Sequence, residues 1–192
     1  MTTLNVLAYP DRVHILVDSL GLSNLGAGSP YATSKFAPLV HLNAVIAMRG
    51  TLRVLPIVWA AANEVAGDFD AVAAALPRIL DDISSQFGGT SSAQVVFAGW
   101  SPNRGRMIAL RFEASPDGSY QMPREIHSLL LLSGDVYAGV VPTIDTLPQL
   151  INSARLQIKH ELEANPGGPF GGRLIMAEIR QDSTVIRFAA AS

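Results

Sequence analysis

The sequence predicts an α+β fold in which two antiparallel sheets are stacked and helices cover both outer faces. Two observations carry this prediction. Short apolar strands and amphipathic helices follow one another in the order strands, two helices, strands, one helix, strands. No internal repeat or low-complexity linker divides the chain, and 192 residues suit one domain, residues 1–192.

A β-hairpin is expected at the start of the chain. Leu4–Ala8 and Val13–Val17 are apolar runs on either side of Tyr9-Pro10-Asp11-Arg12, which has Pro at the second position of a turn. Gly21–Pro30 is rich in Gly, Ser and Asn and is expected to be a loop. Ala44–Met48 then predicts a short buried strand.

Helical spacing of apolar residues predicts two helices in the first half of the chain, Leu52–Ala66 and Phe69–Phe87. Pro77 is expected to kink the second helix or to begin its later half. A third helix is expected to end before Asn165, and its apolar residues are Leu147, Leu150, Ile151, Ala154, Ile158 and Leu162.

The remaining apolar runs predict strands. Turn signals at Pro102-Asn103 and Pro116-Asp117-Gly118 separate the middle ones. The expected strands are Ala93–Gly99, Arg106–Phe112, Ile126–Leu132, Leu174–Ile179 and Thr184–Phe188.

Composition excludes several classes of function. The net charge is −2 and there is no basic cluster, so neither nucleic acid nor an anionic membrane is expected as the main partner. The absence of Cys excludes disulfides, thiolate metal sites and cysteine nucleophiles. We expect no metal and no cofactor, because the four His residues show no paired spacing: His14, His41, His127 and His160. No apolar run approaches the roughly 18 residues of a membrane span, so a cytoplasmic location is expected.

Low charge also favours a homo-oligomer. Only 16% of the residues are charged, against roughly 25% in a typical soluble domain. Several apolar residues lie off the main stripe of the two predicted helices, where neighbouring subunits could bury them. They are Leu52, Ile57 and Ala61 on the first helix and Ala71, Ala75 and Ile79 on the second.

The residue after Met1 carries the strongest chemical signal. Removal of Met1 would give Thr2 a free α-amine, so one residue would hold both a nucleophilic hydroxyl and its own general base. An α-amine has a pKa of about 7.7–8.0 and can accept a proton near neutral pH, unlike lysine. The sequence therefore makes Thr2 a candidate nucleophile.

Four short segments in residues 2–51 together resemble the proteasome β-subunit family and its bacterial relatives among the N-terminal nucleophile hydrolases. They are Thr2-Thr3-Leu4, Asp18-Ser19, Ser34-Lys35-Phe36 and Ile46-Ala47-Met48-Arg49-Gly50-Thr51. The element order agrees over the whole chain. The resemblance implies a four-layer αββα sandwich with Thr2 as nucleophile.

The resemblance implies a role for each matching residue. Lys35 would lower the pKa of the Thr2 hydroxyl and amine through its charge, and Asp18 would keep Lys35 charged and in position. The Gly50 N–H would stabilise the tetrahedral oxyanion, a contact typically worth about 3–4 kcal/mol. Ser133 matches a supporting serine of the family in a late turn.

The second half of the chain departs from the family pattern. Asp135 stands where the family has a second serine. The family's Asp before a Ser-Gly-Gly turn falls on Gly167, and its serine falls on Phe170. Neither supporting side chain is evident, and Asn165 is a candidate substitute.

The resemblance favours a threonine peptidase that acts on peptides or unfolded proteins inside a homo-oligomeric ring. An ATP-dependent unfoldase is then a candidate partner. Two alternatives stay open: a catalytically inactive proteasome-like scaffold or binding protein, and an amidase acting on a small molecule. Tyr31 and Lys35 also resemble the Tyr-x-x-x-Lys stretch of short-chain dehydrogenases. Too few residues precede Tyr31 for a dinucleotide-binding βαβ unit, so that interpretation is set aside.

Overall fold

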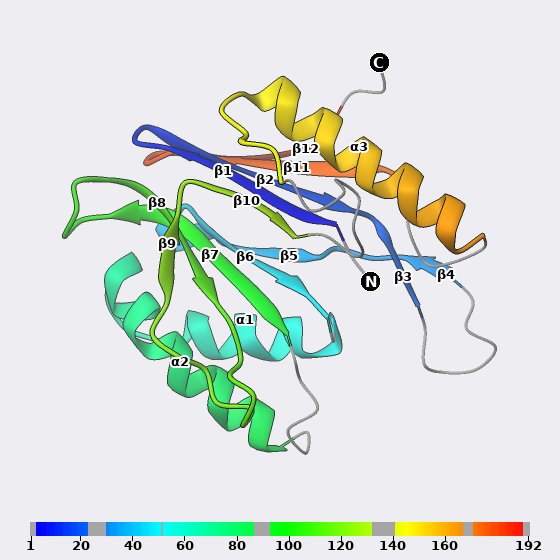
Figure 1. Ribbon diagram of the computed structural model, residues 1–192. Coiled ribbons are helices and arrows are strands. Elements are labelled where there is room, and N and C mark those ends of the chain that lie inside the picture. Colours follow the sequence, from blue (N-terminus) through cyan, green and yellow to red (C-terminus); the bar gives the residue numbers. More distant parts are fainter. Residues whose placement is uncertain are drawn as a thin grey trace.

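The computed structural model describes residues 3–22, 30–50, 52–86, 93–131, 141–166 and 171–189. Within these ranges two five-stranded antiparallel sheets are stacked (Figure 1). Helices α1 (Leu55–Asn63) and α2 (Phe69–Gln86) cover one outer face, and α3 (Leu147–Ala164) covers the other. The predicted αββα fold class is therefore confirmed.

The first sheet contains the predicted hairpin. Its register places Leu4 opposite Val17, and the strand order is β10-β1-β2-β11-β12. The strands are β1 (Leu4–Tyr9), β2 (Arg12–Asp18), β10 (Ser128–Leu131), β11 (Leu174–Ile179) and β12 (Thr184–Phe188).

The second sheet has the order β5-β6-β7-β8-β9. Its strands are β5 (Phe36–Leu39), β6 (Ala44–Arg49), β7 (Gln94–Ser101), β8 (Arg106–Phe112) and β9 (Arg124–Ile126). Two short 3₁₀ turns flank β6 and α1: η1 (Val40–Leu42) and η2 (Leu52–Val54).

Two predictions about strands were wrong. The expected loop Gly21–Pro30 overlaps a small sheet of β3 (Leu20–Leu22) and β4 (Pro30–Ala32). The expected strand Ile126–Leu132 is divided between the two sheets, because β9 pairs with β8 whereas β10 pairs with β1. The chain crosses between the sheets at His127, whose carbonyl accepts a hydrogen bond from the Ala8 N–H. Both errors concern which strands pair with each other, and the amino-acid composition of a segment does not reveal its pairing partner.

Three apolar layers hold the four structural layers together. The middle layer lies between the sheets and includes Val13, Ile15 and Val17, which alternate along β2. Leu16 points to the opposite face and packs in the layer under α3. A third layer joins the second sheet to α1 and α2. Because both faces of β1 and β2 are covered, the sequences of these strands are almost continuous apolar runs.

Helix α2 is continuous through Pro77, so the alternative in which a separate later half begins at Pro77 was wrong, and the expected kink stays a prediction. Two further details differ from expectation. Ile79 is buried in the core, so its predicted place on an oligomer interface was wrong. The buried face of α3 is rotated: Leu162 is 42% exposed, while Ser153, Gln157 and Glu161 are buried. No helix in the described part of the chain is long and apolar enough to cross a membrane.

Candidate active site

A buried ion pair joins the two sheets at one end of the sandwich. Asp18 is the last residue of β2, and Lys35 directly precedes β5. Lys35 Nζ lies 2.8 Å from Asp18 Oδ2, and both residues are fully buried. The Lys35 carbonyl accepts a hydrogen bond from the Met48 N–H at 2.8 Å, which fixes its backbone against β6. The contact between Asp18 and Lys35 that the family resemblance implied is therefore present, and its catalytic role stays a prediction.

The same carboxylate also holds the start of β1. Asp18 Oδ1 accepts a hydrogen bond from the Thr3 backbone N–H at 2.8 Å. Asp18 thus links Lys35 to the residue next to Thr2. Thr2 itself lies outside the described residues, as does Ser133.

The electrostatics of Lys35 are unusual for a lysine. Burial lowers the pKa of Lys35, and the Asp18 charge and hydrogen bond oppose that shift. Beyond Asp18, no described residue accepts a hydrogen bond from Nζ. An ion pair removed from water adds little stability, because desolvation offsets the attraction between the charges. Perturbed, buried charges of this kind occur often at functional sites.

Gly50 follows β6 in a conformation that suits glycine. Its φ is 104°, in the left-handed region where a Cβ atom would be strained. The turn leaves the second sheet beside Met48, whose N–H binds the Lys35 carbonyl. Gly50 therefore follows the strand that anchors Lys35. Its predicted role as oxyanion donor stays a prediction.

Ser19 connects three chain segments beside Asp18. Its carbonyl accepts from the Thr33 N–H at 2.8 Å, and its Oγ accepts from the Arg173 N–H at 2.9 Å. Gly171 and Gly172 precede Arg173 with φ values of 95° and 72°. Residues 167–170, where the sequence departs from the family pattern, lie outside the described ranges. Asn165 is described, and it is exposed.

Sequence reasoning missed a second set of polar residues near this end of the molecule. Arg49, the last residue of β6, is partly buried. Burial lowers the pKa of Arg49, while the charges of Glu161 and Asp18 oppose that shift. Gln157 and Asn5 are also buried, and Asn5 Nδ2 donates to Gln157 Oε1 at 3.0 Å. The four-residue spacing of Ser153, Gln157 and Glu161 was the available signal in the sequence.

An open groove of about 700 Å³ lies between α3 and the strands β11 and β12, and its lining includes Ile158, Leu162 and Phe188. The lining also reaches Gly172 and Arg173, which contact Ser19 beside Asp18. Asp18, Lys35 and Gly50 themselves do not line the groove.

Comparison with known proteins supports the fold. No protein-family model matches the sequence, and no curated protein matches it significantly. The structure is similar to that of a Gly-1 mutant of Anbu from Hyphomicrobium sp. strain MC1. The TM-score is 0.70 at 13% identity, and the match covers 100% of this chain and 88% of the other. The chain thus has a proteasome-like fold.

Proposed function

We propose that this protein is an N-terminal threonine hydrolase that cleaves amide bonds with Thr2 after Met1 is removed. The observation that carries the proposal is the double role of the buried Asp18 carboxylate. It holds the Thr3 N–H with one oxygen and the Lys35 ammonium with the other. This arrangement brings a buried cation to the start of β1, where a Thr2 nucleophile would need one.

The proposed reaction has two steps. Thr2 Oγ attacks the substrate carbonyl and gives its proton to the Thr2 α-amine. The Gly50 N–H stabilises the oxyanion. The amine product leaves with that proton, and an ester to Thr2 remains. Water then attacks the ester and gives a proton to the α-amine. The α-ammonium returns that proton to Thr2 Oγ as the carbon–oxygen bond to Thr2 breaks, which releases the acid and restores the hydroxyl.

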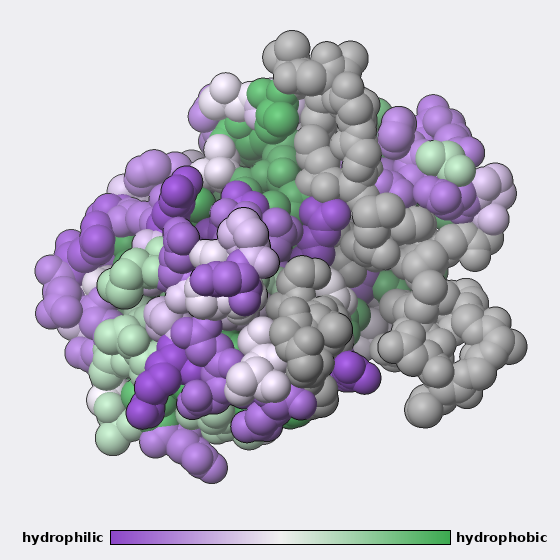
Figure 2. Space-filling view, turned by 60° about the horizontal axis from the view of Figure 1, so that its bottom comes forward, coloured by the Kyte–Doolittle hydropathy of each residue, from purple (hydrophilic) through white to green (hydrophobic). Residues whose placement is uncertain are grey.

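We further propose peptides or unfolded proteins as substrates and a homo-oligomeric ring as the active form. Support comes from large apolar side chains exposed on and near α1: Val40 is 78%, Ile57 39% and Trp59 40% exposed. Figure 2 turns the side with α1 and α2 forward and shows hydrophobic residues among hydrophilic ones. Sedimentation should then give a mass many times the 20.4 kDa of one chain. A monomer at all concentrations would contradict the ring.

Mass spectrometry tests the chemistry directly. The untagged protein should begin at Thr2 and gain one covalent adduct from a β-lactone or epoxyketone probe. Thr2→Ala should abolish both labelling and amide cleavage while the circular dichroism spectrum stays unchanged. Ser85→Ala, which removes an exposed hydroxyl on α2, is the matched control and should label like wild type.

A non-catalytic scaffold is the second candidate function. This function is favoured by the sequence of residues 167–170. Gly167 and Phe170 stand where the proteasome β-subunit family, which the sequence resembles, has its supporting Asp and Ser. An intact Met1 with no adduct in the native protein would establish the scaffold and exclude the hydrolase.

A further inference from the structure

The groove beside α3 has no part in the proposed chemistry. It lies where the second half of α3 runs alongside β11 and β12 (Figure 1). Its volume of about 700 Å³ is within the range of about 300–1,000 Å³ that is typical of ligand pockets. Leu162 on α3 is 42% exposed and Phe188 on β12 is 57% exposed, so both walls present large apolar side chains to solvent. The apolar lining residues are Ile158, Leu162, Leu174, Phe188 and Ala189.

The charged residues that line the groove are mostly cations. In the described part of the chain they are Arg155, Lys159, Arg173 and Glu163. Lys159 and Glu163 lie 3.9 Å apart with side chains that are 73% and 66% exposed, so their pairing is weak. The Arg173 guanidinium carbon lies 4.8 Å from the centre of the Phe188 ring, which keeps a cation at the apolar wall. The groove is therefore complementary to a ligand that carries both apolar and acidic groups.

The β12 wall also offers backbone hydrogen-bonding groups. Strand β12 is last in the strand order, and no strand in the described ranges pairs with its outer edge. The Ala189 N–H donates to the Leu174 carbonyl on β11. Backbone groups of successive residues in an antiparallel strand point alternately to its two sides. Ile186 and Phe188 therefore direct their N–H and C=O groups away from β11.

The outer edge of β12 has little of the protection that edge strands usually carry. Protection commonly comes from charged residues or proline. Val185 is 50%, Ile186 45% and Phe188 57% exposed, and successive side chains lie on opposite faces of the strand. Arg187 is the one charged residue of β12, and its guanidinium lies 3.4 Å from Glu178 within the same sheet. An exposed apolar edge of this kind favours the addition of another strand.

We propose that β12 and the groove capture an extended peptide that contains both apolar and acidic residues. The peptide adds as a strand to the outer edge of β12, with backbone hydrogen bonds to Ile186 and Phe188. Its apolar side chains pack against Leu162 and Phe188. Its carboxylates meet the cations Lys159 and Arg173. The strand edge thus supplies affinity for any extended chain, and the groove selects among side chains.

Capture at this position holds a peptide near the candidate active site. The Arg173 N–H donates to Ser19 Oγ at 2.9 Å, and Ser19 directly follows Asp18. The groove therefore lies at the same end of the sandwich as the ion pair. The inference goes beyond the proposed function, because capture requires no chemistry at Thr2 and would serve a non-catalytic scaffold equally.

Fluorescence anisotropy tests the capture with the full-length Thr2→Ala protein, which would leave the peptide uncleaved. The probe is a fluorescein-labelled ten-residue peptide of Leu, Val and Glu. It should bind, and added salt should weaken the binding. A matched peptide with Lys in place of each Glu should bind about tenfold more weakly. Absence of binding by the acidic peptide, or equal binding of the two peptides, would overturn the proposal.

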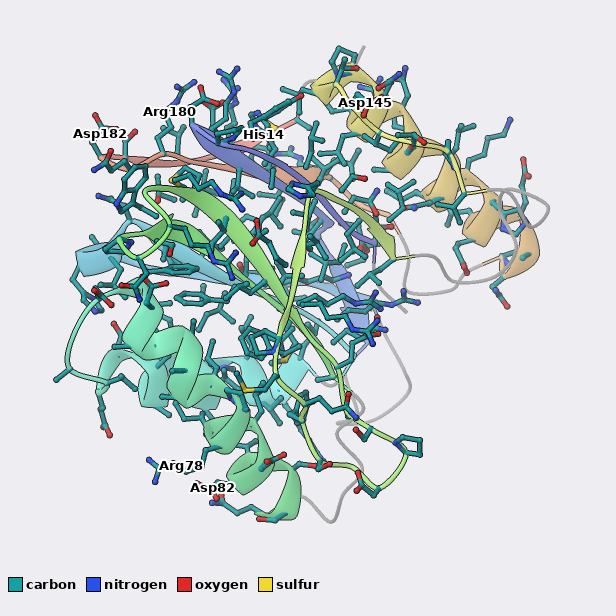
Figure 3. The ribbon with its side chains drawn as sticks, turned by 60° about the vertical axis from the view of Figure 1, so that its left-hand side comes forward. His14, Arg78, Asp82, Asp145, Arg180 and Asp182 are labelled. Carbon is teal, nitrogen blue, oxygen red and sulfur yellow. The ribbon has the colours of Figure 1, made fainter. Side chains whose placement is uncertain are left out.

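Charge reversal tests the location of the peptide. Arg173→Glu should weaken binding of the acidic peptide about tenfold and strengthen binding of the lysine peptide. Arg78→Glu makes the same change at an exposed residue of α2, on the opposite outer face, and should change neither affinity (Figure 3). Equal effects of the two variants would mean that only the net charge of the protein matters, and the groove would lose its assignment.

Ile186→Pro tests the addition of a strand. Proline removes an outward N–H of β12 but no hydrogen bond to β11, so the protein should fold and lose affinity for the peptide. Ile186→Val keeps the N–H and should leave the affinity unchanged. Undiminished binding in Ile186→Pro contradicts strand addition. If Ile186→Pro does not fold by circular dichroism, a peptide N-methylated at its central residues replaces it. That peptide lacks the backbone donors for pairing, and binding as tight as that of the parent peptide contradicts strand addition equally.

Sedimentation tests whether a second copy of the chain occupies the edge instead. The mass of the assembly should be the same with and without Ile186→Pro. A lower mass in Ile186→Pro, together with no peptide binding at the unchanged edge, would assign β12 to contacts between subunits and overturn the proposal.

Discussion

Gly172 approaches Ser19 so closely that a Cβ atom on Gly172 would stand 2.6 Å from the Ser19 hydroxyl oxygen. The same atom would lie 2.9 Å from Leu20 Cγ. This contact therefore packs the turn before β11 against the two residues that directly follow Asp18 in the chain. A glycine is required here both for its φ of 72° and for the space it leaves.

Gly172→Ala should therefore destabilise the protein, by about 1–3 kcal/mol for a strained and overpacked site. Urea unfolding measures the change. Gly105→Ala is the control, since Gly105 has a φ of 60° but a Cβ atom added there would meet no other atom within 4 Å. The difference between the losses of unfolding free energy in Gly172→Ala and Gly105→Ala then measures the effect of the contact with Ser19. Equal losses at both positions would mean that the backbone conformation alone matters.

Asp18→Asn should cost about 3–5 kcal/mol, because it leaves the Lys35 ammonium buried without a counter-charge. Adding Lys35→Met to Asp18→Asn should recover most of this stability, since no buried charge remains. Unfolding in urea gives all three values. Lys159→Met removes a lysine that is 73% exposed and should change stability by less than about 0.5 kcal/mol. A double variant as unstable as Asp18→Asn would show that the ion pair is not the cause.

Lys35→Arg should abolish probe labelling at Thr2 while the protein stays folded. The guanidinium keeps the charge but is larger and planar, and the buried space beside Asp18 is built around an ammonium. Lys35→Ala should reduce labelling by orders of magnitude, because it removes the charge that lowers the pKa of the Thr2 hydroxyl and amine. Lys159→Arg is the matched control. Wild-type labelling rates in both Lys35 variants would remove Lys35 from the mechanism.

Acid should destabilise the fold through His14. This residue is buried on β2 opposite Glu178, with Arg180 nearby (Figure 3). Burial lowers the pKa of His14 below its ordinary 6.5, with help from Arg12, Arg180 and Arg187 and against the Glu178 charge. The unfolded chain therefore binds a proton at a higher pH than the folded protein does. Stability is lost as the pH falls from about 6.5 through the lowered value.

The measurement compares unfolding free energies at about pH 7.5 and pH 5. In His14→Gln the difference between the two values should be smaller than in wild type. His41→Gln removes an exposed histidine and should reproduce the wild-type difference. The same difference in His14→Gln as in wild type would exclude His14 as the source.

The correctly predicted parts of the fold are those for which the evidence lies in residues close together in the sequence. The hairpin follows from two apolar runs around a turn with Pro10, and the pairing of Leu4 with Val17 agrees with it. Asp18 and Lys35 are 17 positions apart, and only the family resemblance brought them together in advance. Strand β5 was missed because it has four residues and contains Pro38. Proline is tolerated there since β5 is an edge strand.

Glu161 shows why the rest of the site could not be predicted. The apolar pattern of α3 predicts that Ile158 and Leu162 face inward. That pattern depends only on the hydrophobicity of the helix residues and carries no information about the strand packed against the helix. The facing strand carries the polar Asn5, which selects Gln157 and rotates the helix. A contact between residues 152 positions apart in the chain leaves no trace in either segment alone.

The central position of β1 has a consequence for how the site can fail. Strand β1 is hydrogen-bonded to β10 on one side and to β2 on the other, and helix α3 covers it. The first part of β1, from Leu4 to Leu7, therefore cannot open without breaking two ladders at once. Opening of this end then requires most of the free energy of global unfolding, so its amides should be among the slowest to exchange with deuterium. On heating, the Asp18–Lys35 ion pair should accordingly break only when the whole domain unfolds.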